Sequence, residues 1–223
     1  MTQVDAMIPM NVHVLPQTRQ LRAMLTIVRD RNAERGDFVL YSQRIIRLLL
    51  ESAMDLLPFE ARDVETPVGS VYEGLRAAGP VFGVSILRAG DSMESVLREM
   101  SPSTRIGKIL IQRDKSTKLP SLYYSNLPND IADGSVLLLD PMLATGGTAL
   151  AAIRVLIEKG VAVENVVFVS FIAAPEGIAA VREQYPQLKI VTSAIERGLN
   201  ANAYMEPGIG DFGDRFFGTQ VSL

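Results

Sequence analysis

The sequence has no cysteine, no tryptophan and a single histidine, His13, among its 223 residues. The lack of cysteine excludes disulfides, zinc–thiolate sites and cysteine nucleophiles. One histidine argues against a Ser-His-Asp triad and against a metal site built from several histidines. Chemistry in this chain must therefore use carboxylates, arginine, lysine, hydroxyls and backbone amides, an inventory that suits phosphate chemistry.

Long apolar runs, a signal sequence and a strong net charge are missing as well. The longest apolar stretch, residues 166–174, has about half the length that a membrane-spanning helix needs. Residues 1–12 lack the basic and apolar segments of a secretory signal. The formal net charge of −3 offers no basic surface to nucleic acid. We therefore expect a cytoplasmic protein that binds neither membranes nor nucleic acid.

The length and the hydrophobic content of 48% predict that the whole chain forms one domain. Its N-terminal part, residues 1–80, contains two helical patterns of apolar residues. Gly36 is predicted to stop the first helix and Asp37 to cap the second, which Pro58 closes. Residues 59–80 alternate polar and apolar side chains, which predicts a short β-ribbon.

The remaining part, residues 81–223, is the predicted core. Apolar runs that do not alternate are typical of strands in a parallel sheet with both faces covered by helices. The predicted strands are 80–87, 106–112, 136–139, 166–174 and 189–194, and the predicted helices are 91–100, 148–159 and 176–185. Residues 114–134 are rich in Pro, Asn and Asp and predict a long functional loop. The sequence thus predicts an α/β fold with a central parallel sheet.

The segment VLLLDPMLATGGTA, residues 136–149, is the most informative. A buried strand ends at Asp140, and a loop of small and hydroxylated residues leads into a helix. Ligands of open parallel sheets bind outside the carboxyl ends of the strands. The amides of Gly146 and Gly147 and the positive end of the helix dipole would form a phosphate cradle. Asp140 could accept hydrogen bonds from two adjacent hydroxyls, as ribose offers. The alternatives are a tight turn for the glycines and a helix cap for Asp140.

Two further segments follow predicted strands. YMEPGIGDFGDRFFGT, residues 204–219, is rich in glycine and aspartate, and its exposed amides and carbonyls could face a planar polar ligand. A packed terminal hairpin is the alternative. SILRAG, residues 85–90, places Arg88 just after a buried strand, where it could meet an oxyanion. A solvated or salt-bridged arginine is the alternative there.

These motifs resemble a known family. The segment from Asp140 to Thr148 is similar to the 5-phosphoribosyl 1-diphosphate (PRPP) loop of phosphoribosyltransferases. Its single acidic residue before Pro141 resembles the uracil phosphoribosyltransferase version. Residues 204–219 resemble the signature that holds uracil in that family, with Glu206 in place of an expected apolar residue. The resemblance runs from Leu15 to Thr219 and implies a type I phosphoribosyltransferase fold with N-terminal helices and a small hood.

The resemblance also implies roles for individual residues. PRPP would be bound by residues of three loops, namely Arg88, Arg113, Asp140, Pro141, Met142, Leu143, Ala144, Thr145, Gly146, Gly147, Thr148 and Asp211. Uracil would be bound by Met205, Gly210, Asp211 and Phe212. The catalytic residues would be Asp140, Asp211 and Arg113. Lys115 and Lys118 are weaker candidates for contacts with the diphosphate.

The implied activity is the transfer of 5-phosphoribosyl from PRPP to uracil, which gives UMP and diphosphate. Mg²⁺ is the implied cofactor, although no residue is predicted to be a metal ligand. Family members form homodimers or homotetramers, and some respond to GTP. One alternative is a non-catalytic regulator on the same scaffold that binds nucleotide or RNA, and the net charge argues against RNA. Another is a transferase for a different base, which the C-terminal signature argues against.

Overall fold

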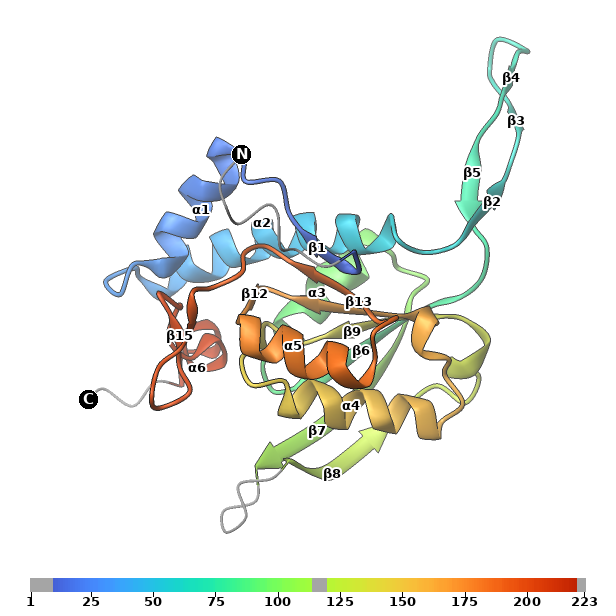
Figure 1. Ribbon diagram of the computed structural model, residues 1–223. Helices are drawn as coiled ribbons and strands as arrows, with labels where there is room; N and C mark the ends of the chain where they lie inside the picture. The colour runs from blue at the N-terminus through green and yellow to red at the C-terminus, as the bar shows by residue number, and fades with distance from the viewer. Residues whose placement is uncertain (1–9, 114–119, 220–223) are drawn as a thin grey trace.

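A seven-stranded sheet forms the centre of the computed structural model, which describes residues 10–113 and 120–219 (Figure 1). The strand order is β1-β13-β11-β9-β6-β7-β8. The bounds are β1 Val12–Val14, β6 Val81–Leu87, β7 Arg105–Arg113, β8 Pro120–Asn126, β9 Ser135–Leu139, β11 Val166–Ser170 and β13 Lys189–Thr192. All neighbours pair in parallel except β7 and β8, which are antiparallel. The predicted central parallel sheet is confirmed, and β8 adds an antiparallel strand at its edge.

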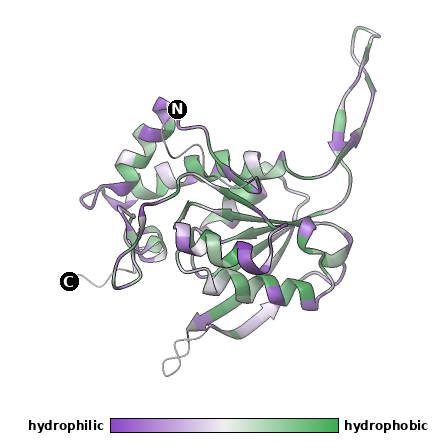
Figure 2. Cartoon of the chain, viewed as in Figure 1, coloured by the Kyte–Doolittle hydropathy of each residue, from purple (hydrophilic) through white to green (hydrophobic). Residues whose placement is uncertain are grey.

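Helices cover both faces of the sheet. Successive strand residues point to opposite sides, so the apolar strands present apolar side chains on both faces, and both must be buried. On one side Leu137 and Leu139 of β9 pack with the helices α1 (Arg19–Arg29), α2 (Arg35–Met54), α3 (Asp91–Met100) and α6 (Phe212–Phe217). On the other, Val136 and Leu138 pack with α4 (Gly147–Glu158) and α5 (Pro175–Gln184). Figure 2 shows the apolar strands at the centre of these layers. Burial on both faces explains why the strands read as unbroken apolar runs.

The boundary between the first two helices differs from the prediction. Thr18 caps α1, since its hydroxyl accepts the Leu21 N–H at 3.1 Å, and the helix already ends at Arg29. Gly36 lies inside the first turn of α2, and nothing stands within 4 Å of where its side chain would begin. Glu34, not Asp37, is the residue before the helix. Asp37 instead lies in the first turn of α2, where its charge suits the helix dipole.

The β-ribbon is confirmed. β2 (Phe59–Ala61) pairs antiparallel with β5 (Leu75–Ala77), and β3 (Val64–Glu65) pairs with β4 (Val71–Tyr72). Figure 1 shows the ribbon extending away from the layered body. Its apolar side chains are therefore largely exposed.

The expected long loop at 114–134 is wrong in part, because residues 120–126 form β8 and only 114–119 lie outside the described residues. Leu122, Tyr123 and Tyr124 of β8 are all about half exposed, so this edge strand lacks the buried apolar run of the other strands. The predicted strand 166–174 divides into β11 and β12 (Ile172–Ala173).

Two short strand pairs complete the fold near the carboxyl ends of the strands. β12 pairs with β10 (Met142–Leu143), and β14 (Gly198–Leu199) pairs with β15 (Met205–Glu206). These elements carry the chain from the sheet to the loops that surround the candidate site. Among the described residues, none of the helices has the length and apolar character needed to cross a membrane.

Candidate active site

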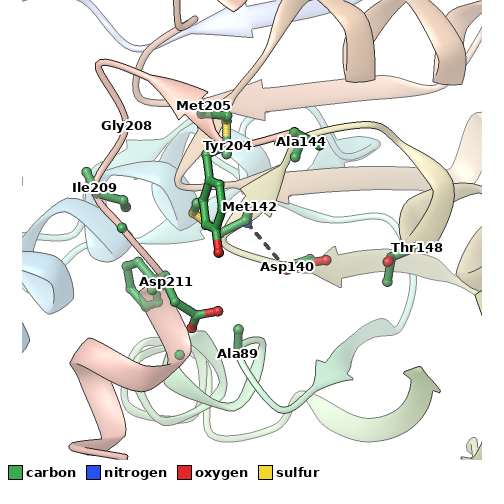
Figure 3. A pocket seen from close by; sticks show the side chains of 14 residues that line it. Ala89, Asp140, Met142, Ala144, Thr148, Tyr204, Met205, Gly208, Ile209 and Asp211 are labelled. Carbon is green, nitrogen blue, oxygen red and sulfur yellow. Dashed lines mark hydrogen bonds between the residues drawn. The ribbon is translucent and has the colours of Figure 1, made fainter. Parts of the chain in front are cut away.

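A cavity of about 440 Å³ lies where β6 and β9 end, between these strand ends and the C-terminal segment (Figure 3). Two segments far apart in the sequence supply most of its wall. The lining residues are Ala89, Asp140, Met142, Ala144, Thr148, Ala203, Tyr204, Met205, Gly208, Ile209, Gly210, Asp211, Phe212 and Gly213. The position agrees with the expectation that ligands of such sheets bind beyond the carboxyl ends of the strands.

The loop from β9 to α4 forms the first wall. Gly146 precedes α4 with a φ of +83°, a left-handed conformation that favours glycine. A side chain at Gly146 would begin 3.1 Å from the Gly177 carbonyl oxygen, so α5 also packs closely here. The first turn of α4 has no acidic residue, so the positive end of its helix dipole would favour an anion. A smaller hollow of about 90 Å³ lies over residues 142–149.

Asp140 is the buried carboxyl of this wall. The Met142 N–H donates to its Oδ1 at 3.4 Å (Figure 3). Burial raises the pKa of Asp140 to about 7, and the weak Met142 contact lowers it only slightly. A ligand with hydroxyl donors would lower the pKa of this buried carboxyl, because each donated hydrogen bond would stabilise its charged form.

The second wall runs from Tyr204 to Gly213. Gly208 and Gly210 have φ values of +66° and +73°, and a side chain at Gly208 would begin 2.2 Å from the Met205 carbonyl oxygen. Both glycines are therefore required by the path of the chain. Asp211 caps α6 by accepting the Asp214 N–H at 2.8 Å. Figure 3 shows the Tyr204 ring and the Asp211 carboxylate on the cavity side of this wall.

The Phe212 ring anchors this second wall in the core. It is 1% exposed, and its centroid lies 5.3, 5.2 and 5.7 Å from those of Phe38, Phe171 and Phe216. Such tilted and stacked aromatic contacts contribute beyond the burial of area alone. Phe212 therefore lines the cavity while its ring is held in the core. Glu206 is exposed and is not part of the cavity wall.

Arg88 is salt-bridged, as the alternative interpretation predicted. Its Nη2 donates to Asp214 Oδ1 at 2.5 Å and its Nη1 to Thr219 Oγ1 at 2.6 Å. The Thr219 hydroxyl and the Arg88 guanidinium hold the pKa of Asp214 below its usual range. The next residue, Ala89, lines the cavity, so the ion pair lies beside it.

The structure brings eight of the predicted site residues to one cavity, namely Asp140, Met142, Ala144, Thr148, Met205, Gly210, Asp211 and Phe212. Leu143, Thr145 and Gly146 line the smaller hollow, and the Leu143 side chain is buried in the core. Pro141 is buried and Gly147 begins α4. Arg113 ends β7, and its side chain lies outside the description, as do Lys115 and Lys118.

Six lining residues were not predicted: Ala89, Ala203, Tyr204, Gly208, Ile209 and Gly213. Four of them belong to the glycine-rich segment 204–219, whose composition was a usable signal. Ala89 adjoins the predicted Arg88. Ala203 has a φ of +61°, which the sequence does not reveal.

The strand order and the covering helices form the fold of the phosphoribosyltransferases. An adenine phosphoribosyltransferase from Trypanosoma brucei, 12% identical, shares the fold with a TM-score of 0.55 over 88% of both chains. A protein of known structure from Aquifex aeolicus is 28% identical, with a TM-score of 0.82 over 95% of this chain and 100% of the other.

The particular family follows from the sequence comparisons. The profile of the uracil phosphoribosyltransferase family matches residues 14–219. The uracil phosphoribosyltransferase of Dictyostelium discoideum is 51% identical over 212 residues, which are 95% of this chain and 98% of the relative. This chain therefore belongs to the uracil phosphoribosyltransferase family.

Proposed function

We propose that the protein transfers 5-phosphoribosyl from PRPP to uracil and releases UMP and diphosphate. The observation that carries this proposal is the single cavity shared by the β9–α4 loop and the segment from Tyr204 to Gly213. One wall suits a ribose phosphate and the other suits a planar base. Two substrates bound side by side would need little further movement to react.

PRPP would occupy the wall formed by the β9–α4 loop. Asp140 would accept hydrogen bonds from the ribose hydroxyls, which would favour its charged form. Amides and hydroxyls of residues 144–148 would hold a phosphate at the start of α4. Arg88 and Arg113 would bind the diphosphate, and Arg88 would exchange the Asp214 carboxylate for phosphate oxygens.

Uracil would lie against the second wall. Its two carbonyl oxygens and its N–H groups need both donors and acceptors, which backbone amides and carbonyls can supply together. Met205, Gly210, Asp211 and Phe212 would provide these contacts, mostly through the backbone, since the Phe212 ring is buried. The Asp211 carboxylate would face both substrates.

In the proposed reaction the bond from ribose C1 to diphosphate breaks as a uracil nitrogen bonds to C1 from the opposite face. Positive charge develops on the sugar and negative charge on the leaving group. Asp140 and Asp211 would stabilise the first, and Arg113 with Arg88 the second. His13 lies in β1 and does not line the cavity, so no imidazole serves as the base. The uracil N–H proton would leave to solvent.

Mg²⁺ would enter with the substrate. Within residues 10–113 and 120–219, no three His, Asp or Glu side chains form a group that could hold a metal ion. Mg²⁺ is often bound by one or two carboxylates together with substrate phosphates. Asp140 and Asp211, the two carboxylates of the cavity, fit such an arrangement. Bound there, the ion would supply positive charge to the leaving diphosphate.

The ribbon would form the contact of a homodimer or homotetramer. Val68, Val71 and Leu75 are 86, 70 and 72% exposed. A lone two-stranded hairpin is marginally stable in water, so a second copy that covers these side chains would stabilise it. A Val71→Lys/Leu75→Lys variant that keeps the oligomeric mass of the native protein in light scattering would contradict this assignment.

GTP as an effector and a cytoplasmic location remain predictions. A titration with GTP that follows the rate of UMP formation tests the first.

UMP formation from uracil and PRPP tests the proposed function. The native protein should produce UMP and diphosphate in equal amounts, and Asp140→Asn should lose most of this activity. Competition among uracil, cytosine and purine bases decides the substrate. A native protein without turnover of any base, or with salt-dependent RNA binding in its place, would overturn the proposal.

A further inference from the structure

Charged side chains, rather than a neighbouring strand, hold the backbone of the second wall at Gly208 and Ile209. Arg29 Nη1 donates to the Gly208 carbonyl oxygen at 3.0 Å. The Gly208 N–H donates to Glu196 Oε2 at 2.7 Å. Arg215 Nη1 donates to the Ile209 carbonyl oxygen at 2.8 Å. Three backbone polar groups of two neighbouring cavity-lining residues are thus fixed from outside the cavity.

Glu196 and Arg29 form a paired, two-point contact. Arg29 Nη2 donates to Glu196 Oε1 at 2.5 Å, and Nη1 donates to Oε2 at 2.9 Å. The Glu196 side chain is 1% exposed, and that of Arg29 is 24% exposed. A buried ion pair of this kind contributes little net stability, because both groups lose their hydration. What it does supply is geometry, since each partner also binds one polar group of Gly208.

Arg215 ties the same wall to the end of α1. Besides Ile209, its guanidinium donates to the carbonyl oxygens of Val28 at 2.6 Å and Asp30 at 2.7 Å. It also lies 4.1 Å from the centre of the Phe38 ring. Arg29 is the last residue of α1. Both arginines therefore connect the second wall to one helix end, which the packing of α1 on α2 keeps in place.

We propose that Arg29, Glu196 and Arg215 are positioning residues that fix the nucleobase half of the cavity. The proposal rests on the proposed function, because uracil is the ligand whose contacts it concerns. A base recognised by backbone groups needs those groups at fixed positions, because a hydrogen bond weakens steeply as its distance and angle depart from ideal. None of the three residues belongs to the β9–α4 loop, and Asp211 is the one proposed PRPP ligand in the second wall. PRPP binding should therefore depend on the three residues much less than uracil binding does.

The test uses variants that loosen the wall without leaving a buried charge unpaired. Arg29→Met/Glu196→Met removes both charges together, and Arg215→Lys keeps the charge but loses the forked contacts. We expect the KM for uracil to rise about tenfold in each, while the KM for PRPP and kcat stay within about twofold. The matched control is Arg47→Met/Glu99→Met, which removes an exposed Arg–Glu pair of 2.8 Å between α2 and α3.

A second measurement does not depend on turnover. Hydrogen exchange of peptides that cover residues 204–213 should be faster in both variants than in the native protein. The double variant removes the acceptor of the Gly208 N–H, and Arg215→Lys loses the forked contacts that hold the Ile209 carbonyl oxygen. An unchanged uracil KM or unchanged exchange in a folded variant would overturn the positioning role, as would an equal rise in both KM values. If the native protein makes no UMP, the proposed function fails, and the exchange result alone decides whether the wall is held in this way.

Discussion

Arg88, in the turn after β6, forms an ion pair of 2.5 Å with Asp214 of α6. The two side chains are 50 and 36% exposed, so water screens the pair and its contribution to folding is small. The pair links a proposed diphosphate ligand to the helix that follows the base wall. Asp214 therefore competes for Arg88 with any phosphate that enters.

This competition predicts opposite effects of two substitutions. Asp214→Asn should lower the KM for PRPP about two- to fivefold, because Arg88 no longer has to leave a carboxylate. Arg88→Gln should raise the same constant at least about tenfold. Steady-state kinetics at varied PRPP measure both. Glu60→Gln, in the ribbon, makes the same change in net charge and should have no effect. A higher KM for PRPP in Asp214→Asn would show that the pair assists binding.

The pKa of Asp140 predicts how stability depends on pH in the absence of ligand. A carboxyl with a pKa of about 7 in the folded protein and an ordinary value of 3.8 holds its proton more tightly when folded. Its contribution to stability is therefore complete below pH 3.8 and is lost as the pH rises through 7.

Asp140→Asn should consequently be more stable than the native protein at pH 8, by an amount on the order of 2–4 kcal/mol. The difference should shrink as the pH falls toward 4, because the carboxyl is then protonated in the folded state and increasingly protonated in the unfolded state. Urea unfolding at pH 8, 6 and 4 measures this difference. Equal stability of the two proteins at all three values would contradict the raised pKa.

Two glycine substitutions separate a required glycine from a dispensable one. Gly146→Ala forces a side chain into a φ of +83° beside the Gly177 carbonyl oxygen. It should cost about 1–2 kcal/mol of unfolding free energy and raise the KM for PRPP. Gly36→Ala is the matched control, because Gly36 lies in α2 with open space around it, and it should stabilise the protein by about 0.5–1 kcal/mol. Thermal unfolding of both variants measures whether Gly146→Ala is less stable and Gly36→Ala more stable than the native protein. A destabilised Gly36→Ala would support the original prediction that Gly36 ends the first helix.

The central strands and the helices between them were predictable because burial on both faces leaves a simple pattern in the sequence. β9 shows this well, since all five of its residues are buried. β8 was not predictable, because an edge strand with exposed tyrosines has the same composition as a loop. β1 was missed because three residues are too few to show a strand pattern, and its partner β13 lies far along the chain.

The candidate site shows the same division. Asp140 and the glycine-rich segment lie in continuous motifs, so the sequence revealed both walls. The contact of Arg29 with Glu196 joins residues separated by 167 positions, and neither belongs to a motif. Such contacts depend on how α1 packs against the loop after β13, which is a property of the folded chain. For the same reason the sequence could not decide whether Arg88 forms a salt bridge or meets an oxyanion.

The place of the Phe212 ring gives the last prediction. If uracil contacts the backbone at Phe212 while the ring fills the core, Phe212→Leu should leave the KM for uracil within about twofold. The same change should lower the unfolding free energy by roughly 1–3 kcal/mol, because three aromatic contacts are lost. Phe171→Leu is the control, since it removes one of these contacts from a residue that does not line the cavity. Denaturant unfolding and uracil kinetics on both variants decide the question. A large rise in the uracil KM for Phe212→Leu alone would mean that the ring itself contacts the base, because the two variants disturb the same aromatic cluster.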